Sequence, residues 1–242
     1  MGKDKLRRFA ELHTFQHVIE ADYNQVYQKD HAVKGTWHKD IFRNNNPIVL
    51  ELGCGKGEYV VALAQIYPDK NFIGIDIKGN RMWVGAKQAL EKGLTNVYFV
   101  RTRIEFIESF FSKDEVDEIW VTFPDPQMQS NRRRKRLTAP SFLNRYKNFL
   151  KPQGIIHLKT DSLFLHKYTK AVIEHNQLPL KVATDDLYNS PYSQLTYGVT
   201  THYEKLFIQK TKKITFLQFQ LLQQEIIDID QTYDRQLLSE SI

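Results

Sequence analysis

The feature that most constrains the fold is a glycine-rich loop that follows a short apolar strand. Residues 48–52 read Ile-Val-Leu-Glu-Leu, and glycine then stands at every second position, at Gly53, Gly55 and Gly57. A helical pattern over residues 59–65 follows immediately. Glycine allows backbone conformations closed to other residues and lets a ligand approach closely, while a helix N-terminus offers unpaired N–H groups. The stretch therefore predicts a strand, a turn and a helix that together hold a ligand.

Apolar strand patterns alternate with helical patterns from residue 48 to residue 222. We expect strands over residues 48–52, 71–76, 96–100, 116–123 and 155–158, with a last strand within 214–222. We expect helices over residues 59–65, 80–90, 103–111, 141–150 and 163–176. Such alternation predicts an α/β fold, with a mainly parallel sheet that helices cover on both faces.

Composition divides the chain of 242 residues into three segments. Residues 1–46 are polar and begin with a basic arm, and an Asn-Asn-Asn-Pro turn closes them. Residues 47–222 carry the alternating pattern, and residues 223–242 form a polar, acidic tail. We therefore expect one large domain with an extension at each end.

The positive charge of the chain is concentrated in one run. The net charge is +6, and residues 132–136 read Arg-Arg-Arg-Lys-Arg, so the rest of the chain is nearly balanced. A concentrated basic run indicates a polyanionic partner such as nucleic acid, although a solvated surface loop is the alternative.

Several classes of protein are disfavoured by what the sequence contains. Cys54 is the single cysteine, which excludes an internal disulfide framework and a cysteine-based zinc cluster. His13 and His17 have helical spacing but no third ligand beside them, so we expect no metal. No apolar run is long enough to cross a bilayer, and no apolar stretch follows the N-terminus as in a secretory signal. We expect a cytoplasmic protein without membrane attachment.

Acidic side chains stand at or near the carboxyl ends of four expected strands. They are Glu51, Asp76, Asp125 and Asp161. Ligands of open α/β sheets bind at these strand ends, whereas helix capping would explain only one or two of the four. The sequence therefore predicts a binding site built on this edge of the sheet.

The glycine spacing separates two classes of ligand. A dinucleotide site requires G-x-G-x-x-G, but Gly53, Gly55 and Gly57 are evenly spaced. Glu51 would repel a phosphate, whereas it suits a ligand that carries an ammonium and a sulfonium. Asp76 is placed to accept hydrogen bonds from both hydroxyls of a ribose.

These residues resemble a known family. Glu-Leu-Gly-Cys-Gly-Lys-Gly at 51–57, with Gly-Ile-Asp at 74–76, resembles the class I S-adenosylmethionine-dependent methyltransferases. Three further motifs resemble the bacterial tRNA (guanine-N7-)-methyltransferases over roughly residues 47–208: Thr-Phe-Pro-Asp-Pro at 122–126, Leu-Lys-Thr-Asp at 158–161 and Thr-His-Tyr-Glu at 201–204. The resemblance implies a Rossmann-like fold with a mainly parallel, seven-stranded sheet.

The resemblance also implies roles for residues that match the family motifs. Asp125 corresponds to the catalytic aspartate. The implied contacts to S-adenosylmethionine are Glu51, Gly53, Gly55, Gly57, Asp76, Arg103 and Asp125. The implied contacts to tRNA are Gln129, Arg132, Arg133, Arg134, Asp161, Thr201, His202, Tyr203 and Glu204.

The sequence departs from the family pattern at three positions. Gln127 replaces a tryptophan, Gln129 replaces a substrate-contacting lysine, and Arg103 replaces an acidic residue that holds the adenine amine. We expect the run at 132–136 to supply the lost positive charge. We expect the main chain or Glu105 to take over the adenine contact.

The chemistry of guanine N7 suits these residue types. N7 carries a lone pair and no proton, so its methylation needs neither a general base at that atom nor a covalent nucleophile. Cys54 is disfavoured as a nucleophile because it lies in the cofactor loop. We predict methyl transfer from S-adenosylmethionine to N7 of a guanine in the tRNA variable loop. Another RNA or protein substrate and a non-catalytic RNA-binding module are the alternatives, and the sequence does not distinguish a monomer from a homodimer.

Overall fold

The computed structural model describes residues 3–196, 198–200, 204, 207–208 and 212–241. The chain forms two compact units, Met1–Ile119 and Trp120–Ile242, and each is described by itself. Of the expected site residues, Thr201, His202 and Tyr203 lie outside the described part.

Unit 1 contains a parallel sheet and the helices that pack on it. Its strands are β1 (Val18–Glu20), β2 (Ile48–Leu52), β3 (Asn71–Asp76) and β4 (Val97–Arg101), in the order β1-β4-β3-β2. Its helices are α1 (Lys3–Leu12), α2 (Tyr23–Val26), α3 (Glu58–Ile66) and α4 (Gly79–Glu91), with the π-helix η1 (Trp37–Phe42) and the 3-10 helix η2 (Ile104–Ser109). β5 (Val116–Thr122) runs across the boundary between the units.

The register of unit 1 brings the predicted strand ends together. The three pairings are parallel, with Leu52 opposite Ile75 and Asp76 opposite Arg101. Every residue of β2 is buried, as expected for a strand covered on both faces. The carboxyl ends of β2, β3 and β4 therefore lie at one edge, as the sequence predicted.

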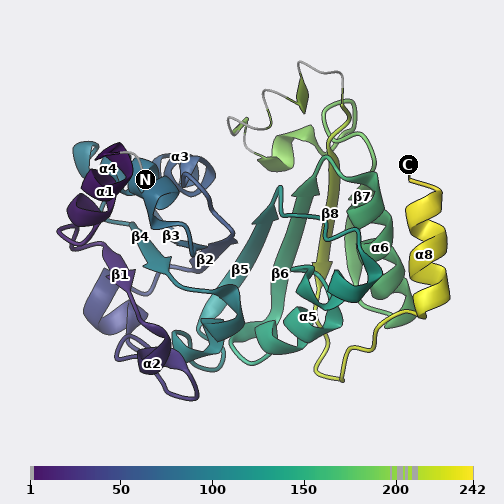
Figure 1. Ribbon diagram of the computed structural model, residues 1–242, viewed down its shortest axis with the longest axis horizontal. Coiled ribbons are helices and arrows are strands. Elements are labelled where there is room, and N and C mark those ends of the chain that lie inside the picture. The colour runs from purple at the N-terminus through teal and green to yellow at the C-terminus, as the bar shows by residue number, and fades with distance from the viewer. Residues whose placement is uncertain (1–2, 197, 201–203, 205–206, 209–211, 242) are drawn as a thin grey trace. The chain divides into compact units, whose positions relative to one another are not determined.

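The N-terminal arm is a helix docked on α4 (Figure 1). Arg7, Arg8 and Lys87 place their charged groups 4.8–5.5 Å from the centre of the Trp83 ring. The Trp83 indole donates a hydrogen bond to Glu11 at 3.0 Å. Part of the basic character of this arm therefore serves packing on α4 through cation–π contacts.

A buried carboxylate ties residues 35–37 to the turn before β5. Glu115 accepts hydrogen bonds from the backbone N–H groups of Gly35, Trp37 and Ser112 at 2.8–3.3 Å. Trp37 is fully buried and stacks on Phe111. Residues of the 1–46 segment thus contribute to the core of unit 1.

Unit 2 contains an antiparallel group of strands in the order β6-β8-β7. These are β6 (Leu150–Thr160), β7 (Leu180–Thr184) and β8 (Thr215–Gln220), and β8 is antiparallel to both neighbours. The helices are α5 (Pro140–Tyr146), α6 (Leu163–His175) and α8 (Gln231–Ser239), with the 3-10 helices η3 (Ser130–Lys135) and η4 (Ser193–Thr196). α6 and α8 lie side by side (Figure 1).

The predicted fold class is confirmed, with eight strands in the described part of the chain instead of seven. The sequence did not predict β1 or β7. β1 has only three residues, and the buried and exposed positions of β7 do not alternate regularly enough to indicate a strand. None of the helices in the described ranges is long and apolar enough to cross a membrane.

Within unit 2, a buried ion pair holds the C-terminal segment against the residues that follow η3. Arg136 and Asp234 have side chains that are 0% and 1% exposed, and they form a bidentate pair. The Arg136 guanidinium also lies over the rings of Phe164 and Tyr168, at 4.6 Å and 4.2 Å from their centres. The segment predicted as a polar tail therefore holds α8, whose buried face includes Asp234 and Leu237.

Asp234→Asn tests this pair. The change leaves the Arg136 charge buried without its counter-ion, and breaking a buried pair costs about 3 kcal/mol. We expect the thermal unfolding midpoint to fall by roughly 6 to 12 °C. Asp230→Asn is the control, because Asp230 is an exposed N-cap and asparagine caps equally well. Equal midpoints for the two variants would contradict a stabilising role for the pair.

Candidate functional site

The glycine loop of unit 1 has the backbone conformation that its sequence predicts. Gly53, Gly55 and Gly57 have φ of 73°, 56° and 68°, in the left-handed region that favours glycine. A Cβ on Gly57 would lie 2.7 Å from the Phe99 ring and 3.3 Å from Cα of Gly85. The loop therefore lies directly against α4 and leaves no space for a side chain there.

Asp76 joins this loop to the start of α4. Its two carboxylate oxygens accept hydrogen bonds from the backbone N–H groups of Gly55 at 2.9 Å and Lys78 at 2.8 Å. The N–H groups of Gly53 and Cys54 both donate to the carbonyl of Ile75, at 2.8 Å and 3.0 Å. A carboxylate oxygen can accept more than one hydrogen bond, so Asp76 keeps acceptor capacity for a ribose hydroxyl.

Glu51 lies beneath the first turn of α3. The side chain is buried, and its Oε2 accepts a hydrogen bond from the backbone N–H of Val60 at 3.0 Å. A carboxylate in this position satisfies one of the free donors at the helix start and complements the helix dipole. Glu51 thus fixes the angle at which α3 leaves the glycine loop.

Cys54 has the environment of an inert thiol. Its burial, followed by the nearby carboxylates of Glu51 and Asp76, raises the pKa of the thiol well above its usual value. Since the thiolate is the nucleophilic form, this environment supports the interpretation of Cys54 as a loop residue without a covalent role.

Arg103 stands at the third of the neighbouring strand ends. It follows β4 and precedes η2, and its side chain is exposed, as is that of Glu105. Arg101, two residues before it, pairs in register with Asp76. The position is therefore close to the glycine loop, although the adenine contact expected of Arg103 or Glu105 stays a prediction.

The residues of unit 1 fit S-adenosylmethionine. The loop lets a ligand approach the backbone, and Asp76 presents carboxylate oxygens at the end of β3. Among the described residues, no three His, Cys, Asp or Glu side chains are grouped as a metal site requires.

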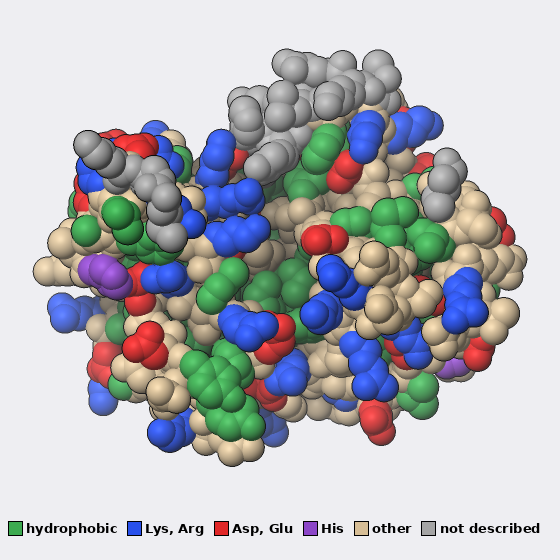
Figure 2. Space-filling view, in the orientation of Figure 1, with side chains coloured by type: hydrophobic (Ala, Val, Ile, Leu, Met, Phe, Trp, Pro, Cys, Tyr) green, Lys and Arg blue, Asp and Glu red, His purple; other side chains and the backbone are tan. Residues whose placement is uncertain are grey.

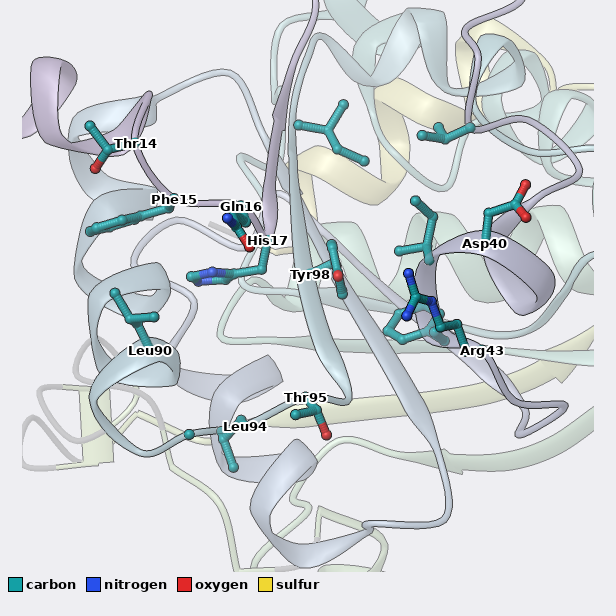
Figure 3. A pocket seen from close by; sticks show the side chains of 15 residues that line it. Thr14, Phe15, Gln16, His17, Asp40, Arg43, Leu90, Leu94, Thr95 and Tyr98 are labelled. Carbon is teal, nitrogen blue, oxygen red and sulfur yellow. The ribbon is translucent and has the colours of Figure 1, made fainter.

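A pocket of unit 1 lies beside the start of β4 (Figure 3). It has a volume of about 770 Å³, and its lining includes Phe15, His17, Leu90, Thr95 and Tyr98. Thr95 and Tyr98 stand at the start of β4, whereas the glycine loop stands at the ends of β2 and β3. This pocket is therefore separate from the cofactor site.

Asp125 of unit 2 is exposed on a short loop that is fixed at both ends. Phe123 and Gln127, two residues on either side, have φ of 47° and 46°, which is uncommon for residues other than glycine. The N–H of Phe123 donates to the carbonyl of Lys159 at 2.8 Å. The carbonyl of Gln127 accepts from Nε of Arg136 at 3.2 Å. The Asp125 carboxylate in turn accepts from the N–H of Gln127 at 3.0 Å.

The basic run divides into buried and exposed charges. Arg136 is fully buried, so it cannot contact a nucleic acid backbone as the sequence suggested for the whole run. Arg133 is half-buried and forms an ion pair with Asp228 at 3.5 Å. Three of the five cations remain exposed on or beside η3: Arg132, Arg134 and Lys135. Gln129, at the N-cap of η3, is exposed on the same segment.

The two remaining described residues of the expected substrate set have different surroundings. Asp161 follows β6, is partly exposed and forms an ion pair with Lys212 at 3.1 Å. Glu204 is fully buried, and its Oε1 lies 2.6 Å from Nζ of Lys159. Its burial favours an internal role for Glu204 over direct contact with substrate.

Three residues near the site were given no individual role by the sequence, although Lys159 belongs to the motif at 158–161 and Arg136 to the basic run. They are Lys159, Tyr188 and, as a buried group, Arg136. Lys159 interrupts the apolar run Ile-Ile-His-Leu-Lys-Thr at 155–160, and a lysine in a buried strand is the one signal that could have identified it. Tyr188 and Arg136 have no comparable local signal.

Known proteins resemble the chain over most of its length. The family model Methyltransf_4, described as "Putative methyltransferase", matches residues 45–217. A tRNA (guanine-N(7)-)-methyltransferase of Bacteroides thetaiotaomicron is 50% identical over 227 residues, which are 94% of this chain and 89% of the relative. One from Christiangramia forsetii is 50% identical over 221 residues, which are 91% of this chain and 99% of the relative.

Solved structures share the fold at low identity. A 30S ribosomal A1408 methyltransferase from an uncultured bacterium matches with a TM-score of 0.57 and 16% identity, over 79% of this chain and 96% of that chain. The 16S rRNA methyltransferase KamB matches with a TM-score of 0.53 and 16% identity, over 80% and 96%. These likenesses show the class I methyltransferase fold alone.

Gly57→Ala tests the close approach of the glycine loop to α4. The added methyl group meets the Phe99 ring, so the loop must shift, and we expect affinity for S-adenosylmethionine to fall more than tenfold by isothermal titration. Gly93→Ala is a matched control, because Gly93 has a similar φ of 63° but no atom within 4 Å of the added Cβ. Equal affinity for S-adenosylmethionine in both variants would show that the glycine loop does not contribute to cofactor binding.

Proposed function

Because this chain belongs to the tRNA (guanine-N7-)-methyltransferase family, we propose that it methylates a guanine in the variable loop of tRNA. The reaction transfers a methyl group from S-adenosylmethionine to N7 of that guanine. The observation that carries this conclusion is the 50% identity to named relatives over 94% of the chain. The exposed, fixed loop at Asp125 supports it independently.

Unit 1 would hold the methyl donor. Bound S-adenosylmethionine supplies an electrophilic methyl group on a sulfonium. Gly53, Gly55 and Gly57 let the backbone approach the donor closely, and Asp76 binds its ribose hydroxyls. Glu51 supplies negative charge at the end of β2 and keeps α3 in place. Arg103 completes this cofactor set at the end of β4.

Unit 2 would orient the acceptor base. The N7 lone pair attacks directly, and the ring gains a positive charge without passing a proton to the enzyme. A carboxylate close to the base stabilises that charge or binds N1–H and the exocyclic amine, and either contact orients N7. Asp125 is suited to this role because its loop is held at Phe123 and Gln127.

Exposed cations near Asp125 would bind the tRNA backbone. Arg132, Arg134 and Lys135 are exposed, and Gln129 and Arg133 belong to the same segment. On the face drawn in Figure 2, Lys and Arg side chains are interspersed with Asp and Glu. The three exposed cations of η3 are therefore better candidates for phosphate contacts than the overall charge. Asp161, with residues Thr201, His202 and Tyr203, would contact the nucleotides around the target.

The cellular setting follows from the substrate. A protein that modifies tRNA works where tRNA is present, and we place this one in the cytoplasm of a bacterial cell. The partner is tRNA.

Nucleotide mapping is the experiment that tests the proposal. Bulk tRNA is incubated with the protein and labelled S-adenosylmethionine, and the labelled nucleotide is located by nuclease digestion and chromatography. We expect 7-methylguanosine at one variable-loop position. Label that persists after that guanine is replaced in a transcript, or label in protein, would overturn the proposal. An absence of cofactor binding by isothermal titration would favour a non-catalytic RNA-binding module.

Asp125→Asn tests the assigned catalytic role. The substitution keeps the shape of the side chain but removes the charge that stabilises the methylated ring. We expect turnover to fall by roughly two to three orders of magnitude, in the range seen on loss of a transition-state contact. The control is Asp114→Asn, because Asp114 is exposed. Asp117 is unsuitable as a control because its carboxylate accepts a hydrogen bond from the backbone N–H of Ile48, at the start of β2. Turnover near that of the wild type would refute the assignment.

Replacing Arg132, Arg134 and Lys135 together by Gln tests the phosphate contacts. Each lost contact should reduce the slope of log K against log salt by about 0.7 to 0.9, so loss of all three contacts should reduce it by about 2 to 3. Filter binding of tRNA at several salt concentrations measures the slope. The triple variant at Lys29, Lys92 and Lys113, which are exposed on unit 1, removes the same charge and is the control. Equal slopes for the two triple variants would place the phosphate contacts elsewhere.

A further inference from the structure

Three aromatic rings meet on the surface of unit 1, and we call them the aromatic platform. The rings of Tyr23 and Tyr27, at the start of α2 and just after its end, are stacked with centres 4.8 Å apart and 18° between their planes. The Phe106 ring of η2 stands steeply to both, at 5.5 Å and 6.5 Å. Tyr23 and Tyr27 nevertheless remain 53% and 47% exposed. Figure 2 shows hydrophobic side chains gathered on the surface where Figure 1 draws α2, with basic side chains beside them.

The backbone beneath the platform is held in place by hydrogen bonds. At the start of α2, the N–H of Asp22 donates to the side-chain oxygen of Gln25 at 2.7 Å. The hydroxyl of Ser109, at the end of η2, donates to the carbonyl of the buried Val26 at 2.8 Å. Because the backbone is fixed before a ligand arrives, binding to these rings orders little further structure and loses little entropy.

The platform is joined to the edge of the sheet that carries the cofactor site. The N–H of Thr102 donates to the carbonyl of Asp76 at 3.2 Å, and the N–H of Phe106 donates to the carbonyl of Arg103 at 2.9 Å. Partial burial, followed by the adjacent tyrosine, raises the pKa of Tyr23, and the positive charge of Arg103 opposes this rise. The platform therefore lies beyond Arg103 on the same edge as Asp76.

The size and charge of the platform suit a nucleic acid base. Two half-exposed tyrosines offer roughly 200 Å² of ring surface, whereas each partner of a stable protein complex buries about 800 Å². Its surroundings carry both signs of charge, because Arg103 is exposed and so are the acidic Asp22 and Glu105. Mixed charge attracts a phosphate backbone weakly, whereas unpaired bases stack on aromatic rings and on the plane of an arginine guanidinium.

We propose that the aromatic platform of Tyr23, Tyr27 and Phe106 binds an unpaired base of tRNA close to the target guanine, by stacking. The contact holds a nucleotide beside the site where the methyl donor binds, and it adds affinity without a phosphate contact. This inference rests on the proposed function, since the base belongs to the same tRNA.

Two double variants test the platform. Tyr23→Ala with Tyr27→Ala removes the stacked rings, whereas Tyr23→Phe with Tyr27→Phe keeps the rings and removes the hydroxyls. Tyr233→Ala is the control, because Tyr233 is 44% exposed on α8 in unit 2. For each protein, filter binding at several salt concentrations gives tRNA affinity and its salt slope, isothermal titration gives S-adenosylmethionine affinity, and thermal unfolding gives the midpoint.

The expected result separates stacking from other contacts. The alanine double variant should bind tRNA about tenfold to a hundredfold more weakly, as on loss of one stacked base. Its salt slope should match the wild type, because a stacked base releases no counterions. The phenylalanine double variant and Tyr233→Ala should bind tRNA within twofold of wild type, and cofactor affinity should stay within twofold in every variant. Unchanged tRNA affinity in the alanine variant, or an equal loss in the phenylalanine variant, would overturn the proposal.

Cross-linking of the wild-type protein keeps the test decisive if the alanine variant folds poorly. The complex with tRNA is irradiated with ultraviolet light, and the cross-linked peptides are identified by mass spectrometry. We expect a peptide that contains Tyr23 or Tyr27, joined to a nucleotide near the target guanine. Cross-links confined to other peptides would overturn the proposal, as would loss of self-association in the alanine variant with tRNA affinity unchanged. If the wild type bound tRNA but did not methylate guanine N7, the proposed function would fail instead, so the two failures are distinguishable.

Discussion

The guanidinium of Arg136 lies between the loop of Asp125 and the C-terminal helix, and unit 2 is arranged around it. It donates to the carbonyl of Gln127, pairs with Asp234 on α8, and lies over the rings of Phe164 and Tyr168 on α6. A buried cation with this many partners tolerates little displacement, because any movement leaves charge without compensation. The position of the Asp125 loop is thereby coupled to Asp234, which lies 109 positions further along the chain.

The two units fix their functional residues by different physical means. In unit 1 the glycine loop is set by backbone geometry, through three left-handed glycines and the carboxylate of Asp76, which follows Gly55 by 21 residues at the end of β3. In unit 2 the Asp125 loop is held by the backbone carbonyl of Lys159 and the guanidinium of Arg136, which are distant in sequence from Phe123 and close to Gln127, respectively. The glycine loop is therefore the more local structure, and the Asp125 loop depends more on tertiary packing.

This difference explains how much the sequence could predict. The strand, loop and helix around Gly53 to Gly57 were predicted correctly, because the periodic spacing of apolar residues, the glycine spacing and the carboxylates at strand ends are local signals. The burial of Arg136 was missed because a run of five basic residues predicts solvent exposure at every position. Glu204 was identified by motif, but its partner Lys159 is 45 residues earlier, and no periodicity links the two.

Two of the departures from the family motif, Gln127 and Gln129, lie close to Asp125 in the sequence. Gln127 replaces a tryptophan, yet its backbone carbonyl and N–H are the groups that connect Asp125 to Arg136, and these are present whatever the side chain. The substitution therefore changes a side chain beside Asp125 without removing the hydrogen bonds that hold the loop. Gln129 removes one cation from the segment, while Arg132, Arg134 and Lys135 remain exposed close behind it. Positive charge is thus displaced along η3, whose position depends on the contacts of Arg133 and Arg136 with residues 228–234.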